Sequence, residues 1–207
     1  FTSSQNMWEW YFDECKANMK NLKRAFDIFL IITTSFLTLP LILMIMLLLI
    51  FFNGANVFHV SKRIGKKNLI FNMYKFRTMK LNTPQIATHL MKNPEDYTSF
   101  IGRILRKLSL DELPQLYNVL IGEMSLVGPR PALFNQKDLI HLRNDKGIPN
   151  LLPGITGWSQ INGRDDLSIE KKVELDDYYK KNMTMLLDIK IILKTFVKVF
   201  NLRGITH

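Results

Sequence analysis

The sequence is poor in cysteine and has no histidine arrangement typical of a metal site. Cys15 is the only cysteine among 207 residues, which excludes an internal disulfide and a zinc site built on several cysteines. Nothing in the chain therefore requires an oxidising compartment. No metal-ligand spacing relates the four histidines, which are His59, His89, His141 and His207. Internal repeats and low-complexity segments are also absent.

Charge is missing from one long stretch. Residues 28–61 contain no Asp, Glu, Lys or Arg, and residues 28–52 are almost all apolar. A straight helix over residues 28–52 would extend roughly 38 Å, which is enough to cross a hydrocarbon core of about 30 Å. The run predicts a membrane segment. A cleaved secretory signal is disfavoured, because the run lies well inside the chain and lacks a small-residue cleavage pattern.

The flanks of this apolar run leave its topology open. Basic residues stand on both sides of it, namely Lys16, Lys20, Lys23 and Arg24 before it and Lys62, Arg63, Lys66 and Lys67 after it. Positive charge normally stays in the cytoplasm, so a single span cannot satisfy both ends. Pro40 removes a helical hydrogen bond in the middle of the run and favours two half-helices that enter and leave by one face. Length alone favours a kinked spanning helix.

The remaining chain predicts an α+β fold that is mainly helical. Residues 57–74 read as a β-hairpin around a polar, glycine-containing connection. Residues 82–98 have little pattern and are interpreted as a loop, and helices are predicted over residues 132–148 and from about Ser168. In residues 186–203 three lysines recur every four positions, which predicts either a basic amphipathic helix on a membrane surface or one packed on the domain with its lysines outward.

Positive charge dominates the composition. The formal net charge is +10, from 28 Lys and Arg against 18 Asp and Glu. This excess points to anionic partners such as phosphates, anionic lipids or nucleic acid. It supports, as one hypothesis, a membrane-anchored module that binds nucleic acid or another anionic polymer. A catalytically silent scaffold in glycan assembly is a further alternative.

The centre of the chain places two adjacent carboxylates among these cations. Asp111 and Glu112 follow Arg106, and a rigid Gly-Pro-Arg-Pro turn then presents Arg130. As a structural interpretation, Ser109 and Glu112 fit a helix capping box. As a functional interpretation, the same helix start attracts phosphate, one carboxylate can attack phosphorus, and its neighbour can hold a divalent metal.

Six short motifs together resemble the bacterial sugar transferases, the monotopic polyprenyl-phosphate phosphoglycosyl transferases. They are Lys-Phe-Arg-Thr-Met at 75–79, Leu-Ser-Leu-Asp-Glu-Leu-Pro-Gln at 108–115, Asn-Val-Leu at 118–120, Met-Ser at 124–125, Val-Gly-Pro-Arg-Pro at 127–131 and Pro-Gly-Ile-Thr-Gly at 153–157. The resemblance covers about residues 20–203 and is to the small members that consist of little more than the catalytic domain.

The resemblance implies transfer of a sugar 1-phosphate from a UDP-sugar to undecaprenyl phosphate, with release of UMP. This is the first membrane step of glycoconjugate assembly, at the cytoplasmic face of the bacterial inner membrane. The residue matching Asp111 is the nucleophile that forms a phosphosugar-aspartyl intermediate. Glu112 matches the second catalytic carboxylate, which is associated with Mg²⁺, the implied cofactor. Asp176 is a further candidate metal ligand.

The same resemblance assigns the substrate site and the anchor. Arg106 and Arg130 are expected near phosphate, and five further residues are expected to line the substrate cleft, namely Lys75, Arg77, Gln160, Asn162 and Arg164. The anchor is expected to be re-entrant and to break at Pro40, although Leu39 stands where many members have serine. Its implied partners are the UDP-sugar, undecaprenyl phosphate, membrane lipids and downstream glycosyltransferases, without nucleic acid.

The implied domain organisation has three parts. Residues 1–19, which begin with Phe1, are an amino-terminal extension interpreted as a processed end, a cloning remnant or an interfacial segment. Residues 20–56 form the re-entrant anchor, and residues 57–207 form the cytoplasmic catalytic domain with its basic amphipathic helix. The polymer-binding hypothesis explains neither the carboxylate pair nor the Gly-Pro-Arg-Pro turn.

Overall fold

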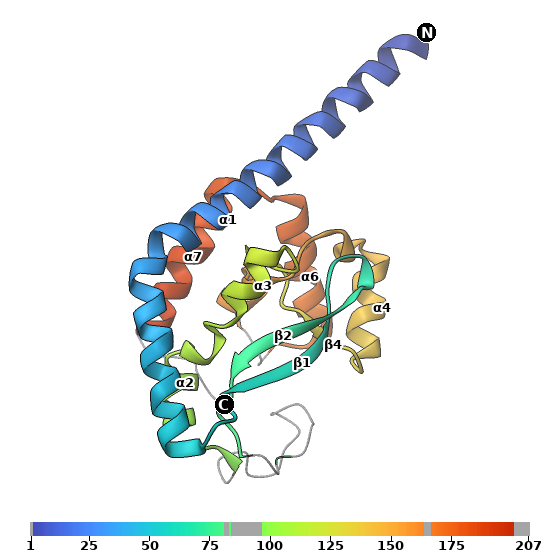
Figure 1. Ribbon diagram of the computed structural model, residues 1–207. Coiled ribbons are helices and arrows are strands. Elements are labelled where there is room, and N and C mark those ends of the chain that lie inside the picture. The colour runs from blue at the N-terminus through green and yellow to red at the C-terminus, as the bar shows by residue number, and fades with distance from the viewer. Residues whose placement is uncertain (1, 81–82, 84–96, 164–166, 201–207) are drawn as a thin grey trace.

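The computed structural model describes residues 2–80, 83, 97–163 and 167–200, with side chains for all of these except 2–17, 53 and 200. It has the expected α+β, mainly helical architecture (Figure 1). The helices are α1 Thr2–Asn53, α2 Phe100–Lys107, α3 Gln115–Ile121, α4 Lys137–Asp145, α5 Trp158–Ile161, α6 Ile169–Lys181 and α7 Met185–Phe200. The strands are β1 Phe58–Ile64, β2 Ile70–Phe76, β3 Ser125–Val127, β4 Ala132–Leu133 and β5 Gly154–Thr156, and short 3₁₀ turns occur at η1 Lys66–Asn68, η4 Leu110–Glu112 and η5 Ile148–Asn150.

Helix α1 contains the apolar run and remains helical through Pro40. The family resemblance implied two half-helices that meet at this proline, and the residues alone also allowed a kinked helix; the structure has one continuous helix that changes direction along its length (Figure 1). Hydroxyls of residues in the preceding turns bond back to backbone carbonyls, as Thr34 Oγ1 does to Leu30 O at 2.6 Å, and such bonds commonly accompany helix bending. Its segment Asn18–Phe52 is long and apolar enough to cross a membrane; an 18-residue window within it has a mean hydropathy of 2.7, and only 11% of that window is buried.

Two separate stretches of α1 pack on the rest of the molecule. Ile31 lies in one core cluster with Phe71 and Met73 of β2. Further along the helix, Ile45 and Leu49 lie in a second cluster, which includes Phe76 of β2 and Leu105 of α2. The outward side of α1 stays apolar and exposed, with Phe36 at 89% and Phe51 at 83%. This distribution leaves a large apolar surface that water would disfavour.

The predicted β-hairpin is confirmed. Strands β1 and β2 pair antiparallel from Phe58 opposite Phe76 to Ile64 opposite Ile70, and Gly65 to Leu69 form the connection. Strand β1 also pairs with the two-residue strand β4, which places β1 in the middle of a three-stranded sheet. The sheet therefore joins the hairpin to the segment that follows the Gly-Pro-Arg-Pro turn.

A second small sheet, which the sequence did not predict, brings two glycine-rich motifs together. Strands β3 and β5 pair in parallel, with Ser125 opposite Gly154 and Val127 opposite Thr156. The two backbones approach so closely that a Cβ atom on Gly154 would lie 2.0 Å from Gly128 N. A Cβ atom on Gly128 would in turn lie 2.4 Å from Leu152 O. Only glycine fits at either position, and the pairing fixes the base of the Arg130 turn.

The two later helices match their predictions closely. Helix α6 begins after Ser168, whose Oγ accepts a hydrogen bond from Lys171 N as an N-cap. Helix α7 carries the predicted lysine row of residues 190, 194 and 198 on exposed positions. The apolar positions beside this row include Leu186, 80% exposed, and Leu193, 60% exposed. The helix packs on the domain through Ile191, which is fully buried, and turns its lysines outward. Its position on a membrane surface stays a prediction.

Candidate active site

A distorted turn positions the two central carboxylates. Asp111 and Glu112 lie in the 3₁₀ turn η4, each 9% exposed. Ser109 precedes this turn in the left-handed region, at φ 54°, and its side chain makes no capping hydrogen bond. The predicted capping box between Ser109 and Glu112 is therefore wrong, because the capping geometry needs an extended Ser109. Helix α3 begins only after Pro114, so the carboxylates stand in the junction between two helices.

Lys75 of β2 links both carboxylates. Its Nζ lies 2.7 Å from Glu112 Oε1 and 4.0 Å from Asp111 Oδ2. The side chains of the lysine and of both carboxylates are largely but not completely buried, with 10–16% of each accessible. The sequence assigned Lys75 to the substrate cleft, and the structure makes it a direct partner of the predicted nucleophile and its neighbour.

Two arginines complete the group that we call the carboxylate site: Asp111, Glu112, Lys75, Arg106 and Arg130. Arg130 NH2 lies 3.1 Å from Glu112 Oε1, so this oxygen faces two cations. Arg106 Nε donates to Thr78 Oγ1 at 2.8 Å, and its positive charge acts on Asp111. The structure thus brings together five of the predicted site residues.

Burial and nearby charges act in opposite directions on the carboxylate site. Burial raises the pKa of the Asp111 carboxyl above its usual range, and nearby Glu112 adds to this, whereas Lys75, Arg106 and Arg130 oppose it. Burial also lowers the pKa of the Arg106 guanidinium, against the attraction of Asp111. A raised carboxyl pKa beside several cations indicates a strained, partly desolvated charge arrangement of the kind found at functional sites.

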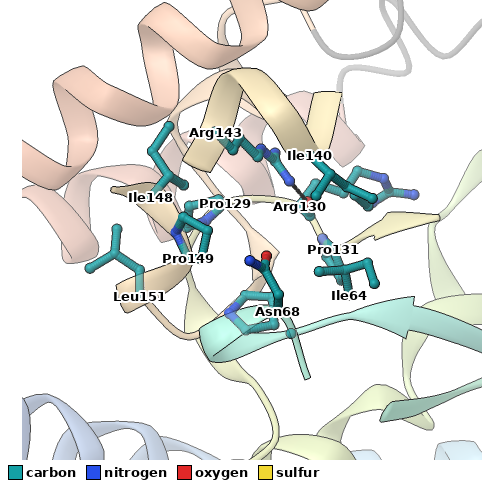
Figure 2. A pocket seen from close by; sticks show the side chains of 13 residues that line it. Ile64, Asn68, Pro129, Arg130, Pro131, Ile140, Arg143, Ile148, Pro149 and Leu151 are labelled. Atoms are coloured by element: carbon teal, nitrogen blue, oxygen red, sulfur yellow. Dashed lines mark hydrogen bonds between the residues drawn. The ribbon is translucent and has the colours of Figure 1, made fainter. Parts of the chain in front are cut away.

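A second buried group, which we call the Asp176 cluster, consists of Asp176, Arg143 and Ser159. Arg143 NH2 and Nε lie 2.6 and 3.1 Å from Asp176 Oδ2, and Ser159 Oγ donates to Oδ1 at 2.9 Å. Asp176 is 1% exposed, and burial raises the pKa of its carboxyl while Arg143 opposes this. Arg143 NH1 also donates to Arg130 O at 2.8 Å, as Figure 2 shows. The cluster therefore supports the turn that presents Arg130.

A small cavity lies beside this support. Its volume of about 30 Å³ would hold a water molecule, not a sugar nucleotide. Its walls come from the hairpin connection, the Arg130 turn and η5, including Ile64, Pro131 and Pro149 (Figure 2). Arg130 lines the cavity, whereas the other four residues of the carboxylate site do not, so the cavity is a packing feature beside the Arg130 turn.

Three predicted cleft residues have other partners in the structure. Arg77 donates to Phe58 O from Nε at 3.3 Å and from NH2 at 3.0 Å, which holds the start of β1. Gln160 accepts from Ser159 Oγ, and its Nε2 is buried without a partner among the described residues. Asn162 Nδ2 donates to Trp158 O within its own short helix. Arg164 lies outside the described residues.

The sequence missed several residues that surround the predicted ones. Thr78 binds Arg106, Arg143 and Ser159 bind Asp176, and Arg63 lies close enough to Arg130 and Glu112 for their charges to act on it. Thr78 stands inside the Lys-Phe-Arg-Thr-Met motif, which was a usable signal. Arg143 and Arg63 carried no local signal, because their partners are remote in sequence.

The donor set can be compared with the needs of Mg²⁺. Among the described residues no group of three or more His, Cys, Asp or Glu side chains could hold a metal ion. Mg²⁺ commonly uses one or two carboxylates and takes its other ligands from substrate phosphates and water, so Asp111 and Glu112 fit this mode. Asp176 fits it poorly, because Arg143 and Ser159 already occupy its two oxygens.

Comparisons with known proteins identify the family of the chain. The family model described as bacterial sugar transferase matches residues 18–202. The chain is 44% identical to the uncharacterized sugar transferase EpsL of Bacillus subtilis, over 89% of this chain and 90% of that protein. It is 37% identical to the exopolysaccharide production protein ExoY of Sinorhizobium fredii, over 88% and 87%.

A longer relative is matched only through part of its length. The UDP-N-acetylgalactosamine-undecaprenyl-phosphate N-acetylgalactosaminephosphotransferase of Aeromonas hydrophila is 36% identical over 84% of this chain and 42% of its own. The family match covers nearly the whole chain and includes every residue of the carboxylate site. The chain is a transferase enzyme that belongs to the bacterial sugar transferase family.

Proposed function

We propose that this enzyme transfers a sugar 1-phosphate from a UDP-sugar to undecaprenyl phosphate and releases UMP. The name of the Aeromonas relative supports both the nucleotide donor and the lipid acceptor. The observation that carries the proposal is the position of Asp111, a partly accessible carboxylate of raised pKa among Lys75, Arg106 and Arg130. Two anionic phosphate substrates need such shielding before a carboxylate can approach phosphorus.

The proposed chemistry has two displacements. An Asp111 carboxylate oxygen attacks the β-phosphorus of the donor, the bond from that phosphorus to the bridging oxygen breaks, and UMP leaves with the bond's electron pair. A phosphate oxygen of undecaprenyl phosphate then attacks the same phosphorus and displaces the Asp111 carboxylate. Both nucleophiles are already anions, so neither displacement needs a general base.

The surrounding side chains have distinct roles in this proposal. Lys75 favours the ionised form of Asp111 and orients both carboxylates through its contacts to Asp111 and Glu112. Arg106 and Arg130 bind phosphate oxygens, for which the planar guanidinium is well suited. Glu112, with Asp111, would hold Mg²⁺, which supplies charge neutralisation at the phosphates when bound.

We also propose that α1 enters and leaves the membrane by the cytoplasmic face of the inner membrane. Both ends of its apolar run are attached to the same folded domain. At the amino-terminal end Arg24 donates to Val119 O and to Leu120 O of α3, and Lys23 lies 2.5 Å from Asp188 of α7. At the other end Ile45 packs in the core with β2 and α2. A helix spanning the bilayer would separate these two attachments.

Topology can be tested by labelling single cysteines in intact cells. In a variant with Cys15 replaced by Ser, cysteines at positions 20 and 62 should be protected from an impermeant maleimide to the same degree and become labelled together after permeabilisation. Labelling of one position alone in intact cells would refute the re-entrant anchor.

The activity is tested by the stoichiometry of UMP release. Purified enzyme with Mg²⁺ and a panel of UDP-sugars should release about one UMP per enzyme without acceptor, and many per enzyme once undecaprenyl phosphate is added. Mass spectrometry should find the phosphosugar on the peptide that contains Asp111. Release that absolutely requires the acceptor would contradict the covalent intermediate, and no release with any sugar nucleotide would contradict the proposed donor.

A metal-removal experiment tests the proposed cofactor. Chelation by EDTA should abolish UMP release, and added Mg²⁺ should restore it, because the phosphates lose their main charge neutralisation. Unchanged release in EDTA would remove the metal from the proposal. Circular dichroism before and after chelation provides the control for folding.

A further inference from the structure

One face of the β-hairpin continues the carboxylate site along β1. Residues directly opposite each other in antiparallel strands project on the same face of the sheet. His59 stands opposite Lys75, Ser61 opposite Met73 and Arg63 opposite Phe71. Lys75 on this face contacts Glu112. His59, Ser61 and Arg63 therefore lie on the side of the hairpin that faces the predicted nucleophile.

The pairing of β1 with β4 brings Arg63 close to the Arg130 turn. Arg63 stands opposite Leu133, and Ile64 stands opposite Ala132, only two residues after Arg130. The two guanidinium groups are near enough to repel one another. Burial and the charge of Arg130 lower the pKa of Arg63 to about 10, and Glu112 only partly offsets this. Positive charge is thus concentrated where β1 meets the turn.

Among the described residues, Arg63 has one side-chain hydrogen-bond acceptor. Its Nε donates to Ser61 Oγ at 3.3 Å, and within the part of the chain that the structure describes no carboxylate reaches it as an ion-pair partner. Glu112, the acidic group that acts on it, is engaged by Lys75 and Arg130. A half-buried guanidinium normally has hydrogen-bonding partners, because leaving it unpaired is costly.

The charge balance of the whole region shows what is missing. Two carboxylates, Asp111 and Glu112, face four cations, which are Lys75, Arg106, Arg130 and Arg63. The side chains therefore leave an excess of positive charge that an anion of about two negative charges would balance. The pKa of His59 is affected by the same positive charge. Burial lowers it, and so do four nearby cations, namely Arg77, Lys75, Arg63 and Arg106.

We propose that Arg63 is a phosphate-binding residue of the active site, which binds one phosphate of a diphosphate ligand while Arg130 binds the other. A planar guanidinium can place two parallel N–H groups on phosphate oxygens, and its position beside Arg130 suits two adjacent phosphates. The proposal deepens the function proposed above, in that the diphosphate ligand is the nucleoside diphosphate part of the sugar donor.

The test compares two variants on the same strand. Arg63→Gln removes the proposed ligand, and Lys62→Gln removes an equal charge from the exposed neighbour on the opposite face of β1. Binding of UDP, UMP and inorganic pyrophosphate to the full chain in detergent with Mg²⁺ is measured by isothermal titration calorimetry. Loss of a charge-assisted phosphate contact should raise the Kd for UDP and pyrophosphate about ten-fold or more, and the Kd for UMP about three-fold or less.

Several outcomes would overturn the proposal. It fails when Arg63→Gln binds UDP as the unaltered chain does, when Lys62→Gln weakens UDP as strongly, or when UMP binding falls as much as UDP binding. If Arg63→Gln lowers the melting temperature so far that little folded protein remains, Arg63→Lys provides the measurement. The lysine keeps the charge without the planar pair of donors, and it should weaken UDP binding by an intermediate factor; unchanged binding counts against Arg63.

Failure of this inference is distinguishable from failure of the proposed reaction. If pyrophosphate binding depends on Arg63 but the enzyme releases no UMP from any UDP-sugar, the proposed phosphate site stands and the proposed UDP-sugar donor is wrong. If UMP release is normal, and the Kd values for pyrophosphate and UDP do not change in Arg63→Gln, the proposed reaction stands and the proposed role of Arg63 is wrong.

Discussion

Two of the buried acid–base groups among the described residues resemble each other in composition and differ in how many of their carboxylate oxygens have partners. In the Asp176 cluster each carboxylate oxygen has a partner, and Asp176 is 1% exposed. In the carboxylate site one oxygen of Glu112 is shared by two cations, and both carboxylates are 9% exposed. Among the described residues, the one ion-pair partner of Asp111 is Lys75, at 4.0 Å.

This difference distinguishes a group with a structural role from a group with a catalytic role. A buried ion pair whose polar atoms have hydrogen-bond partners can hold the backbone in place, as Arg143 does when it binds both Asp176 and Arg130 O. A carboxylate with few partners among excess cations is prepared for a ligand that supplies the missing negative charge. Asp176, which the family resemblance suggested as a metal ligand, belongs by its geometry to the first kind. Variants in the two groups should therefore fail in different assays.

The largest effect is expected from Asp111→Asn. Loss of the nucleophile should lower UMP release about 1,000-fold or more, with little change in melting temperature, because the amide occupies the same space without its charge. The measurement is the rate of UMP release with a UDP-sugar donor and undecaprenyl phosphate. Asp145→Asn, on an exposed pair with His141, is the control and should keep full rate. Retention of more than a tenth of the rate in Asp111→Asn would exclude Asp111 as the nucleophile.

Asp176→Ala should produce the opposite pattern. It leaves the buried Arg143 without its carboxylate, which should lower the free energy of unfolding by about 3–5 kcal/mol. Thermal or chemical unfolding in detergent measures this loss. The double variant Asp176→Ala with Arg143→Met should recover part of the stability, because the uncompensated charge is gone. A normal unfolding free energy with lost activity would instead place Asp176 in the chemistry.

Lys75→Met tests whether Lys75 controls the ionisation of Asp111. Lys75 lowers the pKa of Asp111, so its removal should raise that pKa further. The carboxylate must be ionised to attack, so the acid limb of the pH profile of kcat/KM should move to higher pH, with about ten-fold lower activity at neutral pH. An acid limb that stays in place would show that Lys75 does not control the ionisation of Asp111.

The smallest effect is expected from a surface pair. Lys171 and Glu174 are 2.8 Å apart, with side chains 51% and 68% exposed. Lys171→Ala should change the free energy of unfolding by less than about 0.5 kcal/mol, because solvent screens exposed ion pairs. The free energy of unfolding is measured for both Lys171→Ala and Asp176→Ala. If Lys171→Ala loses nearly as much as Asp176→Ala, burial is not the cause of the difference between the two ion pairs.

Local sequence was a good guide wherever the determining contacts were also local. The uncharged apolar run predicted a long apolar segment, which lies in α1, the polar, glycine-containing connection predicted the hairpin, and Ser168 marked the start of α6. The capping interpretation of Ser109 was wrong, because its backbone is left-handed there. The spacing Ser-x-x-Glu carries no information about that torsion angle.

The sequence by itself determined the acidic pair, the basic excess, the apolar anchor segment and, through its motifs, the family. These depend on residue type and short spacing. Only the tertiary structure decided that Lys75 reaches Glu112 across 37 positions, that Arg143 completes Asp176 across 33, and that Arg63 faces the same site as Arg130. Such partners are chosen by strand register and by the parallel pairing of β3 with β5. Both depend on long-range packing, which no local pattern specifies.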